Sequence, residues 1–112
     1  MLFRKKSKRS DDTLKDNKKT IDYNAALIDV LIVMVEDESI KAKFEEIKHT
    51  MLYLETSYND KVIQADKKIG DMIGDIKVAI NKAQKTNDYA ETNSLINKLE
   101  QLIAERNAYL KK

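Results

Sequence analysis

The chain has 112 residues, of which 42% are hydrophobic and 36% are charged, and its formal net charge is +2. This length is typical of one domain, and the apolar share is higher than in wholly disordered proteins. The chain contains two glycines and neither proline nor cysteine. These counts exclude collagen-like and turn-rich β-sandwich architectures, disulfide frameworks, thiolate metal sites and cysteine nucleophiles.

Positive charge is concentrated at the N-terminus, where residues 1–19 carry eight basic and three acidic side chains. Little apolar surface follows Leu2 and Phe3, so we expect residues 1–19 to form a disordered basic arm before a helical bundle domain at 20–112. The arm either increases solubility, contacts anionic lipid weakly or contacts nucleic-acid phosphate. The net acidic charge of residues 20–112 disfavours nucleic acid. The candidate contact residues are Arg4, Lys5, Lys6, Lys8 and Arg9.

Asp22 is the predicted N-cap of a first helix that ends near Val35. Its apolar run, Ala25–Val35, has eleven residues and includes Asp29, so it is shorter than the roughly 20 residues that span a bilayer. A helix that is apolar nearly all round is expected to lie centrally, covered by its neighbours, with Asp29 at the edge or paired with a lysine. Without a spanning segment or a signal-peptide core, we expect a cytoplasmic protein whose basic arm alone contacts membranes.

Three acidic residues, Glu36–Glu38, then interrupt the pattern, because acidic residues disfavour the end of one helix and favour the start of the next. We expect the first turn there, with Asp37 or Ser39 as the N-cap of the second helix. Lys85–Asp88 marks the last turn, where Asp88 and Glu91 resemble a capping box.

Between these turns the apolar residues recur in alternating steps of three and four, which is the spacing of a heptad stripe. The stripe comprises Ile40, Phe44, Ile47, Met51, Leu54 and Tyr58, followed by Val62, Ala65, Ile69, Met72, Ile76, Ala79 and Ala83. The step from Tyr58 to Val62 breaks the register, and residues 56–60 have poor helix propensity. Either the chain bends there, with Asn59 or Asp60 as a cap, or one helix continues and offers its apolar surface to a second chain.

The sequence therefore predicts an all-α fold with three or four amphipathic helices, in an antiparallel bundle or an elongated helical hairpin with coiled-coil-like packing. No alternation of the kind found in strands is present.

Two clusters of polar residues are candidate sites. Glu46 and His49 share a helix face, as in metal-binding bundles, but His49 is the only histidine and both residues lie off the apolar stripe. Asp71 and Asp75 also share a face, and nearby lysines make an ordinary solvated surface the better interpretation. We therefore expect no metal and no cofactor, and no catalytic constellation is recognisable.

Gly70 and Gly74 have the spacing that allows two helices to approach closely. The charged neighbours of this pair exclude a transmembrane interface. Because glycine inside a helix costs about 1 kcal/mol relative to alanine, either a close helix crossing or a flexible section would explain the pair, and we expect the close crossing at these two interaction candidates.

Two segments carry a resemblance to a known family. Tyr53–Ser57, with the sequence YLETS, resembles an element of the XpaC-like helical proteins, also called the 5-bromo-4-chloroindolyl phosphate hydrolysis family. The isoleucines from Ile69 to Ile80 and the segment Leu95–Leu102 are similar to the helices that follow in that family, so that the resemblance covers roughly residues 35–103. It implies a helical protein in the cytosol or at the membrane, with a poorly defined phosphoester-related role. It assigns no site residue.

These observations predict a small non-enzymatic interaction or scaffold protein that acts through an apolar helix face, with a protein partner or a second copy in a homodimer. The alternatives are a membrane- or nucleic-acid-associated protein tethered by the basic arm, and an XpaC-like protein.

Overall fold

The computed structural model describes the backbone of residues 2–110 and the side chains of residues 12–110. It contains four helices: α1 (Leu2–Met34), α2 (Glu38–Leu52), α3 (Asp60–Thr86) and α4 (Ala90–Leu110). No strand occurs among the described residues. The predicted all-α fold is confirmed, with four helices in residues 2–110.

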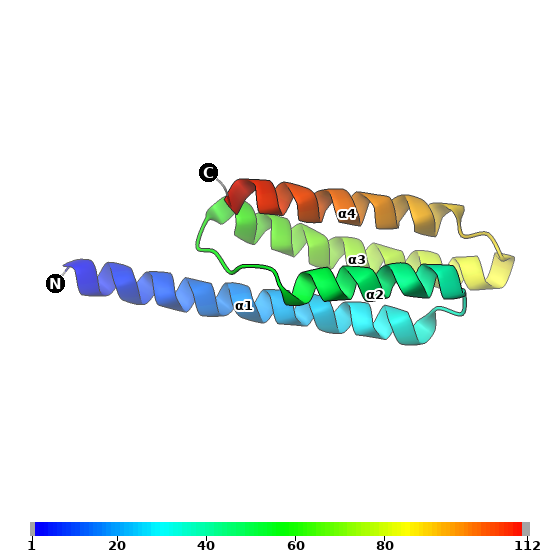
Figure 1. Ribbon diagram of the computed structural model, residues 1–112, viewed down its shortest axis with the longest axis horizontal. Helices are drawn as coiled ribbons and strands as arrows, with labels where there is room; N and C mark the ends of the chain where they lie inside the picture. The colour runs from blue at the N-terminus through cyan, green and yellow to red at the C-terminus, as the bar shows by residue number, and fades with distance from the viewer. Residues whose placement is uncertain (1, 111–112) are drawn as a thin grey trace.

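The helices form two hairpins that pack against each other (Figure 1). Helix α1 packs against α2, and α3 packs against α4, while α1 and α3 join the hairpins. Helices that follow one another in the chain are antiparallel, whereas α1 and α3 run in the same direction (Figure 1). The molecule measures 60 × 23 × 19 Å, and the N-terminal part of α1 projects beyond the other helices.

The first helix begins well before the predicted boundary at residue 20. Residues 2–19 belong to α1, and Asn17 is buried against other elements. Asp22 is not an N-cap: it lies inside the helix, where its carboxylate pairs with Lys18 one turn earlier at 2.9 Å. The polar composition of this segment suggested disorder. The cost of burying the Asn17 amide is offset by its hydrogen bonds with Asp66 and Ser57.

The turn between α1 and α2 lies at the predicted acidic residues. Asp37 is the N-cap of α2, and its Oδ1 accepts hydrogen bonds from the Ile40 backbone N–H at 3.0 Å and the Ser39 hydroxyl at 2.6 Å. The Glu36 N–H donates to Gln84 Oε1 at 2.9 Å. The prediction of Asp37 as a cap is confirmed, and the bond to Gln84 ties this turn to α3.

The capping role of Asp37 makes a prediction about pH. The Ser39 hydroxyl and the Ile40 N–H lower the pKa of Asp37. A lowered pKa in the folded state means that the stabilisation is complete above the ordinary aspartate pKa of about 3.9 and is lost as the pH falls through the lowered value. We expect Asp37→Asn, which keeps the capping oxygen, to reduce the loss of stability in acid. Urea unfolding from pH 6 to pH 2 measures this, and an unchanged pH profile in Asp37→Asn would contradict it.

The chain bends between α2 and α3, so that the continuous-helix alternative is wrong. Residues 53–59 are not helical, and Asn59 caps α3 by accepting from the Lys61 N–H at 2.8 Å. Two hydrogen bonds hold the connection to the bundle: the Ser57 N–H donates to Asn17 Oδ1 at 3.0 Å, and Arg106 Nη2 donates to the Glu55 carbonyl at 2.6 Å. These bonds from α1 and α4 stabilise the bend without glycine or proline.

The last turn also lies at its predicted place. Asn87 adopts the left-handed conformation with φ 59° and ends α3 by donating its N–H to the Ala83 carbonyl at 2.7 Å. The Asp88 carboxylate accepts from the Ala90 N–H at 3.0 Å at the start of α4.

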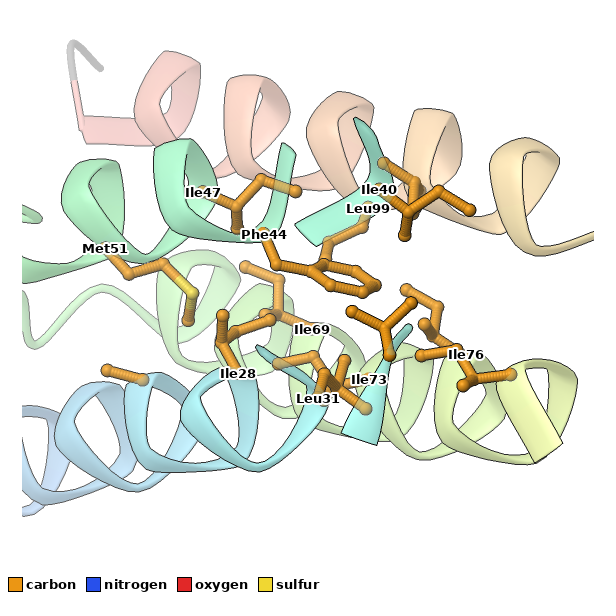
Figure 2. Close-up of a cluster of buried hydrophobic side chains, with 14 of the residues drawn as sticks. Ile28, Leu31, Ile40, Phe44, Ile47, Met51, Ile69, Ile73, Ile76 and Leu99 are labelled. Atoms are coloured by element: carbon orange, nitrogen blue, oxygen red, sulfur yellow. The ribbon is translucent and has the colours of Figure 1, made fainter. Parts of the chain in front are cut away.

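The core is built from the heptad stripe, which faces inward in both α2 and α3. Figure 2 shows the Phe44 ring of α2 lying among side chains from the other three helices. The central residues are Ile28, Leu31, Ile40, Phe44, Ile47, Met51, Ile69, Ile73, Ile76 and Leu99. Tyr58 departs from the prediction because it lies on the connection and is exposed. The bend thus turns most of the stripe into a core rather than a surface for another chain.

Candidate interaction surface

A buried polar cluster joins α1, α3 and α4. The carboxylate of Asp66 receives Arg106 Nε at 2.7 Å on one oxygen and Asn17 Nδ2 at 2.7 Å on the other. The amide of Asn24 donates to the Asp66 backbone carbonyl at 2.9 Å. All four side chains are at most 3% exposed. Each charge therefore has its partner inside the fold.

The chemistry of this cluster is structural. The desolvation cost of a buried ion pair is offset only when the hydrogen-bonding groups of both partners are satisfied. Here the carboxylate and the guanidinium bind each other and neighbouring groups. Sequence reasoning missed the cluster. A signal was present, because Asp66 lies next to Ala65 on the buried stripe and Arg106 lies three residues after Ile103.

Gly70 and Gly74 lie on α3 beside α1, and the space around the two residues differs. A Cβ at Gly70 would lie 2.8 Å from Asn24 Oδ1, whereas a Cβ at Gly74 would have no neighbour within 4 Å. The close approach therefore involves Gly70 and the Asn24 amide. Gly74 lines a shallow surface groove between α1 and α3, together with Tyr23 and Leu27.

The two glycines make a matched prediction. We expect Gly74→Ala to stabilise the protein by about 1 kcal/mol, because alanine favours helix and the added methyl group meets open space. Gly70→Ala is expected not to raise the stability, since the methyl group would displace the buried Asn24 amide, which is hydrogen-bonded to Asp66. Urea unfolding of both variants measures the difference, and equal stabilisation by the two alanines would contradict the close approach.

The two polar clusters predicted from the sequence lie at the surface of α2 and α3. His49 contacts the Tyr53 ring edge-on, with ring centroids 5.1 Å apart, and it lines a surface depression on α2 together with Glu46. Among residues 12–110, no group of three or more potential metal ligands comes together. Asp71 and Asp75 are exposed on α3.

The basic contact candidates fall outside the described side chains. Arg4, Lys5, Lys6, Lys8 and Arg9 lie on the backbone of α1, and the structure describes side chains from residue 12 onward.

The largest departure from the sequence prediction is the outward side of α1. Tyr23 is 65% exposed, Val30 43% and Val33 84%, and Ala26 between them is also exposed. The steps from 23 to 26, 30 and 33 are three, four and three, so these side chains share one face of the helix. We call Tyr23, Ala26, Val30 and Val33 the outer stripe. The helix was expected to be covered all round, but its neighbours cover only the inner side.

Two ion pairs flank the outer stripe. Lys18 pairs with Asp22 at 2.9 Å within α1, and Lys48 of α2 pairs with Asp29 at 2.6 Å. The predicted pairing of Asp29 with a lysine is confirmed. In these pairs the lysines neutralise the carboxylates of Asp22 and Asp29, which lie beside the apolar residues.

A second groove lies between α2 and α4. Its lining combines Ile47 and Ile103 with polar residues such as Thr50 and Asn107. Lys43 Nζ donates to Asn93 Oδ1 at 3.2 Å and connects the two helices. The mixed lining presents no cluster of reactive groups.

No family model, curated protein or solved structure matches this chain. Within the described residues, none of the helices combines the length and the apolar character that crossing a bilayer requires.

Proposed function

We propose that this chain is a small non-enzymatic interaction protein that binds a partner helix through the outer stripe of α1. The observation that carries the proposal is the 84% exposure of Val33 at the end of a regularly spaced apolar face. Exposed apolar side chains that cluster on one face, rather than scatter singly, are typical of protein interaction sites. Heptad spacing is the geometry that a second helix can pack against.

The core supports this proposal, because it does not need the outer stripe. The inward side of α1 already supplies Ile21, Ala25, Ile28 and Leu31 to the interior, and Val35 follows at the end of the helix. Val33 is 84% exposed and adds little burial to the folded chain, and Val30 is 43% exposed. A fold-stabilising role therefore does not explain their apolar character, whereas contact with a partner does.

Substitution of Val33 tests the proposal. We expect Val33→Lys to leave the free energy of unfolding within about 0.5 kcal/mol of wild type, as is usual for surface positions. We expect it to weaken binding of a synthetic amphipathic peptide with valine and leucine at heptad a and d positions by at least about tenfold, since lysine on the face disrupts apolar packing. Fluorescence anisotropy of the labelled peptide measures the affinity.

Leu52→Lys is the matched control, because Leu52 is 53% exposed at the end of α2 and does not belong to the outer stripe. It is expected to bind the peptide as wild type does. Equal binding by wild type and Val33→Lys, or no peptide binding at all, would contradict the proposed function.

The other expectations assign no further residues to this surface. Tethering by the basic N-terminal residues, a cytoplasmic location and the XpaC-like relationship all stay predictions.

A further inference from the structure

The N-terminal part of α1 continues the helix beyond the bundle. Its backbone is helical from Leu2, and it projects past the ends of the other helices at one end of the molecule's longest axis (Figure 1). Asn17 is the residue at which a buried hydrogen bond joins α1 to α3. The residues near the start of α1 are therefore presented at a distance from the core.

This projecting part carries the basic cluster of the chain. Arg4–Arg9 contains five basic residues and no acidic one. Asp11 and Asp12 follow the cluster, but residues 1–19 still hold eight basic and only three acidic side chains. Residues 20–112 hold 13 basic and 16 acidic side chains. The positive charge of the protein is thus concentrated on one projecting helix end.

The distance to the bundle lets this cluster attract an anion despite the acidic bundle. Arg9, the last residue of the cluster, lies eight residues before Asn17, which corresponds to about 12 Å of helix. Exposed charges separated by more than about 8 Å are largely screened at physiological salt. A flat anionic surface can therefore meet the helix end while repulsion from the bundle stays weak.

We propose that Arg4–Arg9 bind the anionic headgroups of a lipid bilayer. Each basic residue close to such a surface raises the binding constant by about fivefold. Leu2 and Phe3 directly precede the cluster, and apolar residues beside basic ones add burial at the boundary between headgroups and acyl chains. Nucleic-acid phosphate would use the charge but not these two apolar residues, so lipid is the better partner. No residue of the outer stripe takes part, and the inference is independent of the proposed function.

Flotation of the full chain with vesicles tests the proposal. We expect the protein to float with vesicles of phosphatidylcholine and phosphatidylserine at low salt, and to be released from them at high salt. We expect no flotation with vesicles of phosphatidylcholine alone. Equal flotation with both kinds of vesicle would overturn the proposal, because it would show that the anionic headgroups are not recognised.

Two double variants locate the contact. Lys5→Gln with Lys6→Gln is expected to weaken binding to the anionic vesicles by more than about tenfold, since it removes two basic residues of the cluster. Lys82→Gln with Lys85→Gln is the matched control, because both lysines are exposed near the end of α3 that lies opposite the N-terminus of α1 (Figure 1). It is expected to bind as wild type does, and equal losses in the two double variants would contradict a contact at the projecting end.

Phe3→Ser separates lipid from nucleic acid. We expect this variant to weaken binding to the anionic vesicles by at least about threefold, because less apolar surface is buried, and to leave binding of a short DNA duplex unchanged. A chain that binds the duplex more tightly than the vesicles would overturn the proposal in favour of nucleic acid. A chain that binds neither at low salt would overturn it outright.

Discussion

Replacing Arg106 with alanine is expected to destabilise the protein by about 3–5 kcal/mol, because it leaves a buried charge without its partner. Arg106 is fully buried and donates to Asp66 and to the Glu55 carbonyl. Its removal leaves the Asp66 carboxylate with Asn17 as its remaining side-chain donor, and it removes one of the two hydrogen bonds that hold the connection between α2 and α3. Urea unfolding followed by circular dichroism measures the loss.

Two variants separate the ion pair from simple loss of packing. The double variant Asp66→Leu with Arg106→Met removes both charges and is expected to be more stable than Arg106→Ala, since apolar replacement of a buried pair is often tolerated. Lys18→Ala removes an exposed pair and is expected to cost less than about 1 kcal/mol. A cost for Arg106→Ala as small as that for Lys18→Ala would contradict the buried network.

Phe44→Ala is expected to cost about 3–5 kcal/mol, because it removes a large side chain from the centre of the core. Phe44 is 0% exposed and lies among residues from all four helices. Tyr58→Ala is the matched control, since Tyr58 belongs to the same sequence stripe but is 64% exposed. It is expected to be nearly neutral. Thermal and urea unfolding compare the two, and similar losses would contradict the bend that separates these residues.

The turns and the core were largely predictable from the sequence. Asp37 and Asn59 are side chains that compete for backbone N–H groups, so their position marks helix starts wherever the chain turns. Phe44, Ile69 and Ile76 recur at spacings that place them on one helix face. Whether the chain bends near Asn59 was not decided by these patterns, because it depends on bonds from Asn17 and Arg106, which are 40 or more positions away.

The buried polar network was not predictable by the same reasoning. Asn17 and Arg106 have polar side chains that normally favour solvent, and their burial depends on partners from three different helices. The predicted disorder of residues 1–19 was wrong for Asn17 for this reason. Composition measures the average polarity of a segment, whereas the burial of Asn17 depends on its specific hydrogen bonds to Asp66 and Ser57.

The exposure of the outer stripe could not be predicted from the apolar run that contains most of it. Because Ala25–Val35 is apolar on nearly every side, the sequence predicted full coverage. The structure covers the side with Ile28 and Leu31 and leaves Val30 and Val33 exposed. Two hairpins that meet along α1 and α3 do not surround α1, so one face of this helix stays exposed.

Hydroxyl-radical footprinting of Tyr23 against Tyr58 is the most direct test that the outer stripe is a contact surface. The two rings are 65% and 64% exposed, so they are expected to react equally in the dilute protein. When the heptad peptide is added, Tyr23 is expected to become protected while Tyr58 stays reactive. Equal reactivity of both rings under all these conditions would contradict the proposed role of α1.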